Sequence, residues 1–229
     1  MLFTQPDHAA LAAALLALWR RDGLPEHPRR SDVLLAIREH DNGWRETDAA
    51  PRISIQTGLP LTFHELADED RIDLWRRGVH RFAAGTPFVA QLILRHALEI
   101  HRDYWSSKPW LEFGAELAEL EQELQETSGA APSECENAYR FLEIADTLSL
   151  GACGALGTQR GQTAGGYHFE VGLGRIGLDP FPLAGATTLG IAYRKLAKRS
   201  FDTSTDLAVA LAVATWNRFS VRVEPSKSQ

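Results

Sequence analysis

Cysteine and long apolar segments are scarce in this sequence. Its two cysteines, Cys135 and Cys153, do not have the spacing of a CxxC pair, so the sequence supports neither a disulfide framework nor a thiolate zinc site. No apolar run approaches the roughly 20 residues that cross a bilayer. The first residues, MLFTQPDH, lack the basic and apolar regions of a signal peptide. We therefore predict a cytoplasmic protein with no membrane partner.

Basic residues are also in deficit. The chain has 24 Lys and Arg against 30 Asp and Glu, which gives a formal net charge of -6. Non-specific binding to nucleic acid depends on basic surface that neutralises phosphates, so we expect no nucleic-acid partner. The deficit lies in residues 1–150, which hold 15 basic and 25 acidic residues, whereas the remainder holds 9 and 5.

Common motifs of nucleotide-binding and hydrolytic enzymes are missing or out of context. The sequence contains no GxxxxGK[ST] phosphate loop and no GxSxG nucleophile elbow. The stretch GLGRIG has the glycine spacing of a dinucleotide-binding turn but lacks a strand-to-helix context, so we interpret it as a simple turn.

The overall composition is that of a globular protein, and the distribution of residue types changes along the chain. Apolar residues make up 44% of the 229 residues and charged residues 24%. Eleven of the 18 glycines lie between Gly151 and Gly190, whereas five of the six tryptophans precede residue 111. We therefore predict two domains, a helical domain at residues 1–158 and a Gly- and Pro-rich β appendage at 159–229 that packs on it.

Apolar periodicity predicts a mainly α-helical protein. Helical patterns cover residues 6–21, 31–41, 66–85, 87–105, 109–126 and 134–150. Short strand patterns follow at 166–183, 187–197 and 217–225, with a short alanine-rich helix at 206–215. The expected fold class is thus a helical bundle with a small C-terminal α+β appendage.

Four of these helices carry histidine or aspartate on the face that should be buried. His8 shares a face with Ala12 and Leu15, and the other candidates similarly extend the apolar stripes of their helices. Imidazole and carboxylate donors together suit a site for Mn, Fe, Ni, Zn or Mg with open positions. The predicted metal ligands are His8, His40, Asp41, His96 and Asp146.

Each candidate also has an ordinary structural interpretation. A single buried histidine is more often a satisfied core residue than a ligand, Asp41 could begin a turn, and Asp146 could pair with Arg140. His80 is a further candidate. His101 lies five residues after His96, about 140° round a helix, so the two are not expected to bind one ion.

The stretches DHAALAAALLALW, LLAIREHDNGW and RFLEIADTLSL resemble the ordered motifs of the HD metal-dependent phosphohydrolase superfamily. More narrowly, QPDHAALA, EHDNGW, LILRHA and DPFPL resemble domain-of-unknown-function family 3891. The superfamily resemblance implies an all-helical, HD-like core that binds one or two divalent metal ions through His8, His40, Asp41 and Asp146. It places His96 where two-metal members have an additional histidine.

Three functions follow from this resemblance. The first is a metal-dependent phosphohydrolase, with Asp41 as the catalytic residue that orients water and with a small phosphorylated molecule as substrate. Arg38, Arg45 or Arg95 could then hold the phosphate. The second is a two-iron oxygenase of the inositol oxygenase kind, and the third is a non-catalytic sensor or interaction protein that the metal stabilises. The β appendage could cover the pocket as a lid or form a contact in a homo-oligomer.

Overall fold

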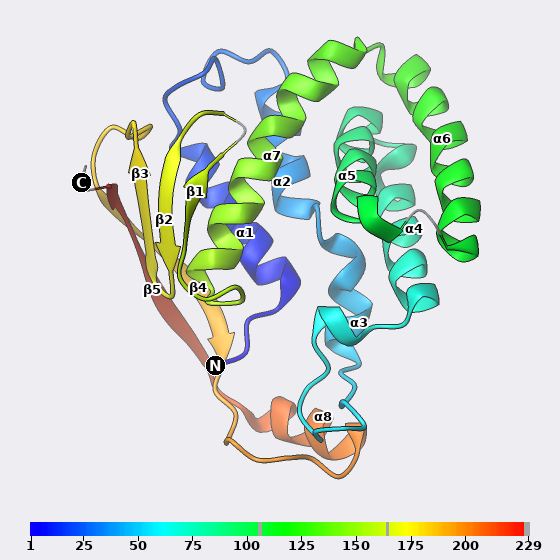
Figure 1. Cartoon of the computed structure of the whole chain (residues 1–229), viewed down its shortest axis with the longest axis vertical. Helices are drawn as coiled ribbons and strands as arrows, with labels where there is room; N and C mark the ends of the chain where they lie inside the picture. The colour runs from blue at the N-terminus through cyan, green and yellow to red at the C-terminus, as the bar shows by residue number, and fades with distance from the viewer. Residues whose placement is uncertain (105–106, 164, 227–229) are drawn as a thin grey trace.

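The computed structural model describes residues 1–104, 107–163 and 165–226, in which a group of helices lies against a five-stranded mixed β-sheet (Figure 1). The long helices are α1 (Gln5–Ala17), α2 (Arg30–Glu39), α4 (Asp68–Ala83), α5 (Pro87–Ile100), α6 (Lys108–Ser128) and α7 (Pro132–Ala152). Helices α1 and α7 contact the sheet, and α5 lies among α2, α4, α6 and α7. All six long helical patterns of the sequence are therefore confirmed as helices. The pattern at 87–105 ends earlier than predicted, at Ile100, and residue 105 lies outside the described residues.

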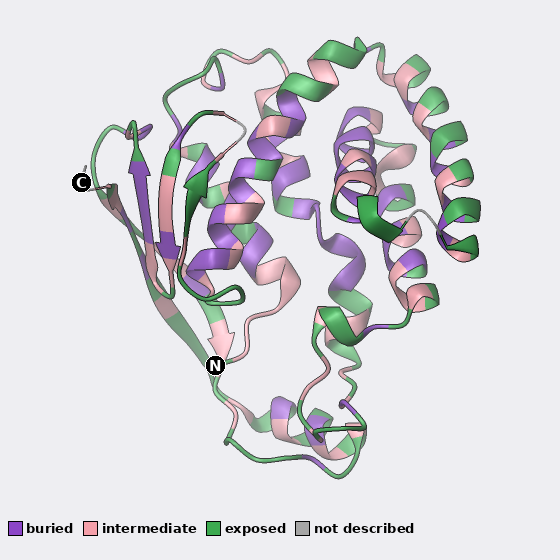
Figure 2. Ribbon diagram, in the orientation of Figure 1, coloured by how far each residue is buried: buried purple, intermediate pink, exposed green. Residues whose placement is uncertain are grey.

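Helix α5 is the centre of the helical layer. Nine of its 14 residues are buried, which is expected for a helix that is apolar on nearly every face (Figure 2). It begins at Pro87, whose fixed φ suits the first helical turn and whose missing N–H would have no partner there. Helix α1 begins similarly, and its N-cap Thr4 accepts a hydrogen bond from the backbone N–H of Asp7.

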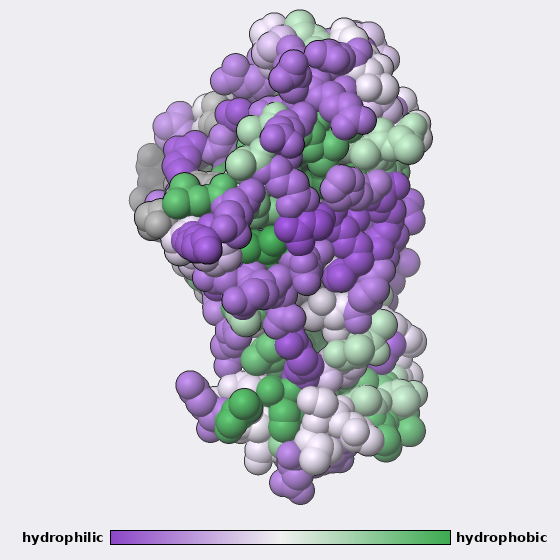
Figure 3. Space-filling view, turned by 90° about the vertical axis from the view of Figure 1, so that its right-hand side faces the viewer, coloured by the Kyte–Doolittle hydropathy of each residue, from purple (hydrophilic) through white to green (hydrophobic). Residues whose placement is uncertain are grey.

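Short elements connect the long helices. They are the 3₁₀ turns η1 (Asn42–Trp44), η2 (Phe63–Glu65) and η3 (Arg102–Tyr104), and the helices α3 (Arg45–Ala49) and α8 (Ser204–Val213). Helix α8 lies at the lower end of the molecule, where apolar residues gather on the face shown in Figure 3. Val209 and Val213 of this helix are exposed. No helix in the described part of the chain is long and apolar enough to cross a membrane.

The sheet is built from the last third of the chain. Its strands are β1 (Gln159–Gln162), β2 (His168–Gly172), β3 (Arg175–Asp179), β4 (Thr187–Arg194) and β5 (Trp216–Pro225), in the spatial order β1-β2-β3-β5-β4. The predicted turn in GLGRIG is present at Leu173 and Gly174, between the antiparallel strands β2 and β3, and the other four residues of the stretch belong to these strands. Strand β5 runs parallel to β3 and antiparallel to β4, so the last strand of the chain lies inside the sheet.

The sheet and the helices share one hydrophobic core. Val171, Ile176, Val221 and Val223 belong to the same cluster of buried residues as the apolar faces of the helices. Gly151 of α7 lies so close to β2 that a Cβ there would be 2.3 Å from Val171 Cγ2. The expectation of a mainly α-helical protein with a small appendage is therefore confirmed only in part, because the five-stranded sheet makes the fold α+β. The division into domains 1–158 and 159–229 stays a prediction.

Candidate metal centre

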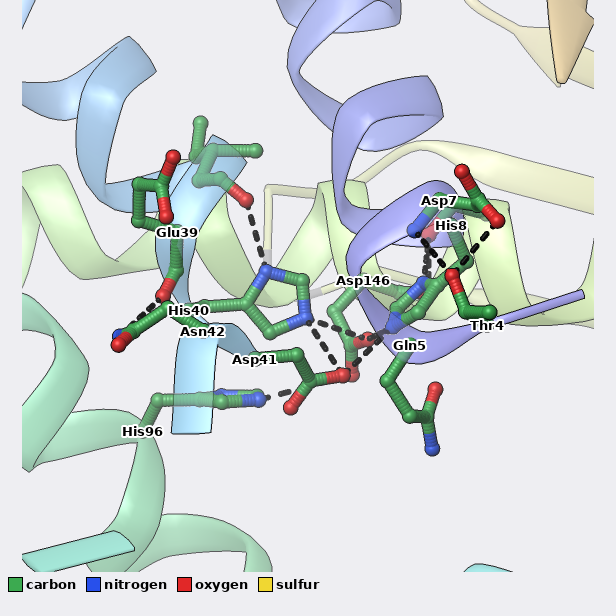
Figure 4. A network of polar contacts seen from close by, with 12 residues as sticks. Thr4, Gln5, Asp7, His8, Glu39, His40, Asp41, Asn42, His96 and Asp146 are labelled. Atoms are coloured by element: carbon green, nitrogen blue, oxygen red, sulfur yellow. Dashed lines mark hydrogen bonds and ion pairs between the residues drawn. The ribbon is translucent and has the colours of Figure 1, made fainter. Parts of the chain in front are cut away.

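Five polar side chains from four helical segments meet inside the helical layer (Figure 4). The three imidazoles are almost inaccessible, with His8 2%, His40 1% and His96 3% exposed. Each comes from an apolar helix face, because the helical period that buries the neighbouring aliphatic residues also buries the histidine. The structure thus brings together all of the predicted ligands: His8, His40, Asp41, His96 and Asp146.

The Nε2 atoms of the three rings face the two carboxylates. His8 Nε2 lies 2.7 Å from Asp41 Oδ2, and His40 Nε2 lies 3.5 Å from the same oxygen. His40 Nε2 is also 3.3 Å from Asp146 Oδ1, and His96 Nε2 is 3.9 Å from Asp146 Oδ2. Two groups, His8–His40–Asp41 and His40–His96–Asp146, each have ligand atoms within 4.8 Å of one another. They share His40, whose Nε2 can bind only one ion, so a second ion would depend on the donors that are not shared.

The opposite ring nitrogens of the same histidines have partners that fix the rings. His40 Nδ1 donates to the backbone carbonyl of Ile37 at 2.7 Å. His8 Nδ1 lies 2.9 Å from Ser149 Oγ, and His96 Nδ1 lies 3.3 Å from the hydroxyl of Tyr139. Metal-binding histidines typically use their second nitrogen in this way, which orients the ring and selects the tautomer.

The two carboxylates perturb the acid–base properties of the cluster. Burial lowers the pKa of His40, but the negative charges of Asp41 and Asp146 outweigh burial and raise this pKa to about 9. Burial raises the pKa of Asp146, yet the nearby positive charge of His40 holds it well below its usual range. Burial lowers the pKa of His96 to about 4, so this ring is neutral at pH 7 and its lone pair is available.

These residues fit a divalent cation. His40 Nε2 is buried and makes no hydrogen bond, although it points between two carboxylates. A buried polar atom without a partner is costly unless a missing ligand satisfies it. Three imidazole nitrogens with two carboxylates favour Mn, Fe, Ni or Zn over Mg, which prefers oxygen donors and water.

The two other histidine candidates lie outside this cluster. His80 is half exposed and faces Glu116 at 3.9 Å. His101 donates from Nδ1 to the carbonyl of Ala97 and stacks on Trp110. Neither histidine belongs to the two ligand groups found among the described residues.

Helix α4 holds the turn that carries His40 and Asp41. The side chain of the next residue, Asn42, is buried and donates to the carbonyls of Glu39 and Gly78. Arg81 donates to both the main-chain and the side-chain oxygen of Asn42. Gly43 packs directly on the backbone of α4, where a Cβ would lie only 2.2 Å from the carbonyl oxygen of Leu74.

These supporting contacts were not predicted from the sequence. The contacts of Ser149 and Tyr139 could have been predicted from helical spacing. Ser149 stands three residues after Asp146 and Tyr139 stands seven residues before it, on one helix face. Nothing in the sequence indicated that Asn42 and Arg81 would meet across 39 residues.

A pocket of about 410 Å³ adjoins the cluster at His8. Its wall includes Trp44, from the turn after Asp41, and Asp48 of α3. Burial raises the pKa of Asp48 to about 7, with a further increase from the charges of Asp41 and Asp7, although the backbone N–H of Gln5 donates to its carboxylate.

The arginines near this pocket differ from the predicted ones. Those that line it are Arg52 and Arg194. The candidates from the sequence, Arg38, Arg45 and Arg95, instead face Glu39 or Glu99.

The comparisons with known proteins assign the chain to a family without assigning an activity. A family model described as a protein of unknown function (DUF3891) matches residues 1–198. No curated protein and no solved structure matches the chain.

Proposed function

The chain belongs to the DUF3891 family, and we propose that it is a metal-dependent phosphohydrolase that acts on a small phosphoester. The metal ligands are His8, His40, Asp41, His96 and Asp146, with the HD-like arrangement that the sequence motifs imply. One observation carries the proposal: three buried imidazoles direct Nε2 toward two carboxylates, while Nδ1 of each ring has a partner elsewhere.

The chemistry of the donors supports hydrolysis. A divalent ion held there would polarise a phosphoryl oxygen and lower the pKa of water at the site toward neutrality. Asp41 orients the attacking water and accepts its proton, because a carboxylate can bind a metal through one oxygen and act as a base with the other. Arg52 and Arg194 line the adjoining pocket; Arg52 is paired with Asp70 at 2.8 Å, so Arg194 is the one that supplies positive charge near the phosphoester.

A two-iron oxygenase is the second candidate. The observation that favours it is the pair of overlapping ligand groups that share His40, since a second ion would have His96 and Asp146 as its own donors. Two irons per chain and oxygen consumption would support this function over phosphoester hydrolysis.

The test of the proposal is a phosphoester assay on protein that has been stripped with chelator and reloaded separately with Mn, Ni, Zn and Fe. We expect hydrolysis of an aryl phosphomonoester or phosphodiester that depends on the added metal, and loss of at least 10²-fold in rate in Asp41→Asn, as for removal of a general base. Asp103→Asn, on an exposed side chain of η3, is the matched control.

Two results would contradict the proposal. Hydrolysis that persists without metal would rule out the metal as the source of activity. A fully loaded protein that turns over none of the esters would favour a sensor or interaction protein.

A further inference from the structure

The pocket beside His8 has walls of two kinds. Large apolar or aromatic side chains form one part of it, among them Phe3, Trp44, Leu61, Phe63 and Leu150. They come from the N-terminal segment, the turn after the ligand pair, the loop before α4 and the end of α7. The pocket is thus assembled from distant parts of the chain around one end of the metal cluster.

The charged groups of the wall favour an anion. Among the described residues that line the pocket, two are arginines, Arg52 and Arg194, and one is acidic, Asp48. The Nε atom of Arg194 is buried without a hydrogen-bond partner, and Nη1 donates to the carbonyl of Leu211. Burial raises the pKa of Asp48 to about 7, which reduces its repulsion of an anion at neutral pH.

The apolar walls discriminate against polar ligands. A sugar or glycerol group that lies against the apolar part of the wall, at Phe3, Trp44 and Phe63, would lose its hydrogen bonds to water and find few replacements on these side chains. An apolar or aromatic group gains about 25 cal/mol for each Å² that it buries. A volume of about 410 Å³ lies within the roughly 300–1,000 Å³ of small-molecule sites.

We propose that this pocket binds the organic group of the substrate and selects phosphoesters with an aromatic or apolar group over those of sugars and polyols. This inference takes the reaction from the proposed function, whereas the preference among organic groups follows from the residues of the pocket. His8 connects the pocket to the metal cluster, because it lines the pocket and also contacts Asp41. Trp44 offers a flat surface within the same wall.

The experiment measures binding of 1-naphthyl phosphate and of glycerol 2-phosphate to the chelator-treated full chain by calorimetry, so that no hydrolysis occurs. We expect 1-naphthyl phosphate to bind at least 10-fold more tightly. Ala155→Trp and Thr47→Phe, which narrow the pocket from two different walls, should each weaken its binding at least 10-fold. Ala186→Trp, at an exposed alanine outside the pocket, should bind as the wild type does.

A second control variant changes an exposed apolar residue that does not line the pocket. Val213 is 79% exposed on α8, at the apolar end seen in Figure 3. Val213→Asp should leave naphthyl phosphate binding unchanged, and circular dichroism should confirm that all variants are folded.

The outcomes separate this inference from the proposed function. Equal affinity for the two esters, or full affinity in the folded Ala155→Trp and Thr47→Phe variants, would overturn the pocket assignment even if the enzyme is active. Pocket-dependent binding of naphthyl phosphate to a protein that hydrolyses nothing after reloading would retain the pocket and reject the phosphohydrolase.

Discussion

His40 is the residue that joins the two parts of the cluster. It belongs to both potential ligand groups, and its Nε2 faces both carboxylates without making a hydrogen bond. Its Nδ1 is committed to the carbonyl of Ile37, so the ring can present only Nε2 to the site. The raised pKa of His40 has the same origin as metal affinity, because two buried carboxylates require a nearby positive charge.

The hydroxyl of Ser149 should control metal affinity through His8. Its Oγ donates to the carbonyl of Asp146 and therefore accepts from Nδ1–H of His8. We expect Ser149→Ala to weaken metal binding by about 10- to 100-fold without unfolding the protein, as measured by competition with a chromophoric chelator. Ser133→Ala, at an exposed serine of the same helix, is the control, and equal affinity of the two variants would argue against this role.

Asp48 should make stability depend on pH. Its pKa is about 7 in the folded protein and near 3.8 when unfolded, so between these values the native state holds a proton that the unfolded state has lost. Stability from this group is therefore present at low pH and lost as the pH rises toward 7. We expect Asp48→Asn to be more stable than the wild type at pH 8, by about 1.4 kcal/mol or more if at least one pKa unit is involved.

The comparison requires denaturant unfolding at several pH values. The advantage of Asp48→Asn should shrink as the pH falls and disappear below the unfolded pKa of 3.8, where the carboxyl is protonated in both the folded and the unfolded state. A difference that does not vary with pH would mean that the carboxylate of Asp48 titrates normally.

At the residue scale, the sequence was sufficient to predict which side chains converge and insufficient to predict their surroundings. His8, His96 and Asp146 each extend an apolar helical stripe, so periodicity alone placed them inside. Asp48 carried no such signal, because its burial arises from the N-terminal segment, whose Gln5 contacts it from 43 residues away.

The turn after α2 is the element that sets the positions of His40 and Asp41. It is fixed by side-chain hydrogen bonds from α4 and by the close approach of Gly43 to Leu74. The motif HDNGW thus has a glycine at this position because there is no space for a Cβ. The conformation of the motif depends on α4, which follows it in the chain.

Gly43→Ala should therefore displace the ligand pair. The added Cβ would lie 2.2 Å from Leu74 O, and relief of such a contact requires the turn or α4 to move. We expect a loss of about 1–3 kcal/mol in the free energy of unfolding together with reduced metal content. Gly85→Ala is the matched control, because a Cβ there meets no atom within 4 Å. Unchanged metal content in Gly43→Ala would show that the turn tolerates movement.

At the element scale, prediction succeeded for the long helices, for α8 and for strands β2 to β5, and failed for elements without an apolar pattern. The six long helices carry two or more turns of apolar pattern, and all six are present. The strand β1, with the sequence QRGQ, and the five-residue helix α3 have no pattern of their own. They form because neighbouring elements supply the pairing and packing, which the local sequence does not encode.

The whole molecule depends on its last strand. Strand β5 lies between β3 and β4, and Val221 and Val223 belong to the main core. The order of the strands was not predictable, because the alternation of apolar residues identifies a strand but does not identify its neighbours. The family match ends at residue 198, so it does not include this strand.

A chain that ends at residue 198 should not fold stably. It would lose the partner of β3 and β4 and expose the apolar residues that β5 covers. We expect it to lack a cooperative thermal transition by circular dichroism, whereas a chain that ends at Ser226 should unfold as the full chain does. A cooperative transition of the shorter chain near that of the full chain would contradict this dependence.

The most direct measurement is the metal content of the untagged protein, purified without chelator and analysed by plasma mass spectrometry. If four helical segments form a metal centre, the wild type and His27→Ala should contain about one or two ions of Mn, Fe, Ni or Zn per chain, because His27 lies outside the cluster. His40→Ala and Asp41→Asn, confirmed as folded, should contain almost none. Full metal content in both of these variants, or no metal in the wild type even after reloading, would contradict the metal centre.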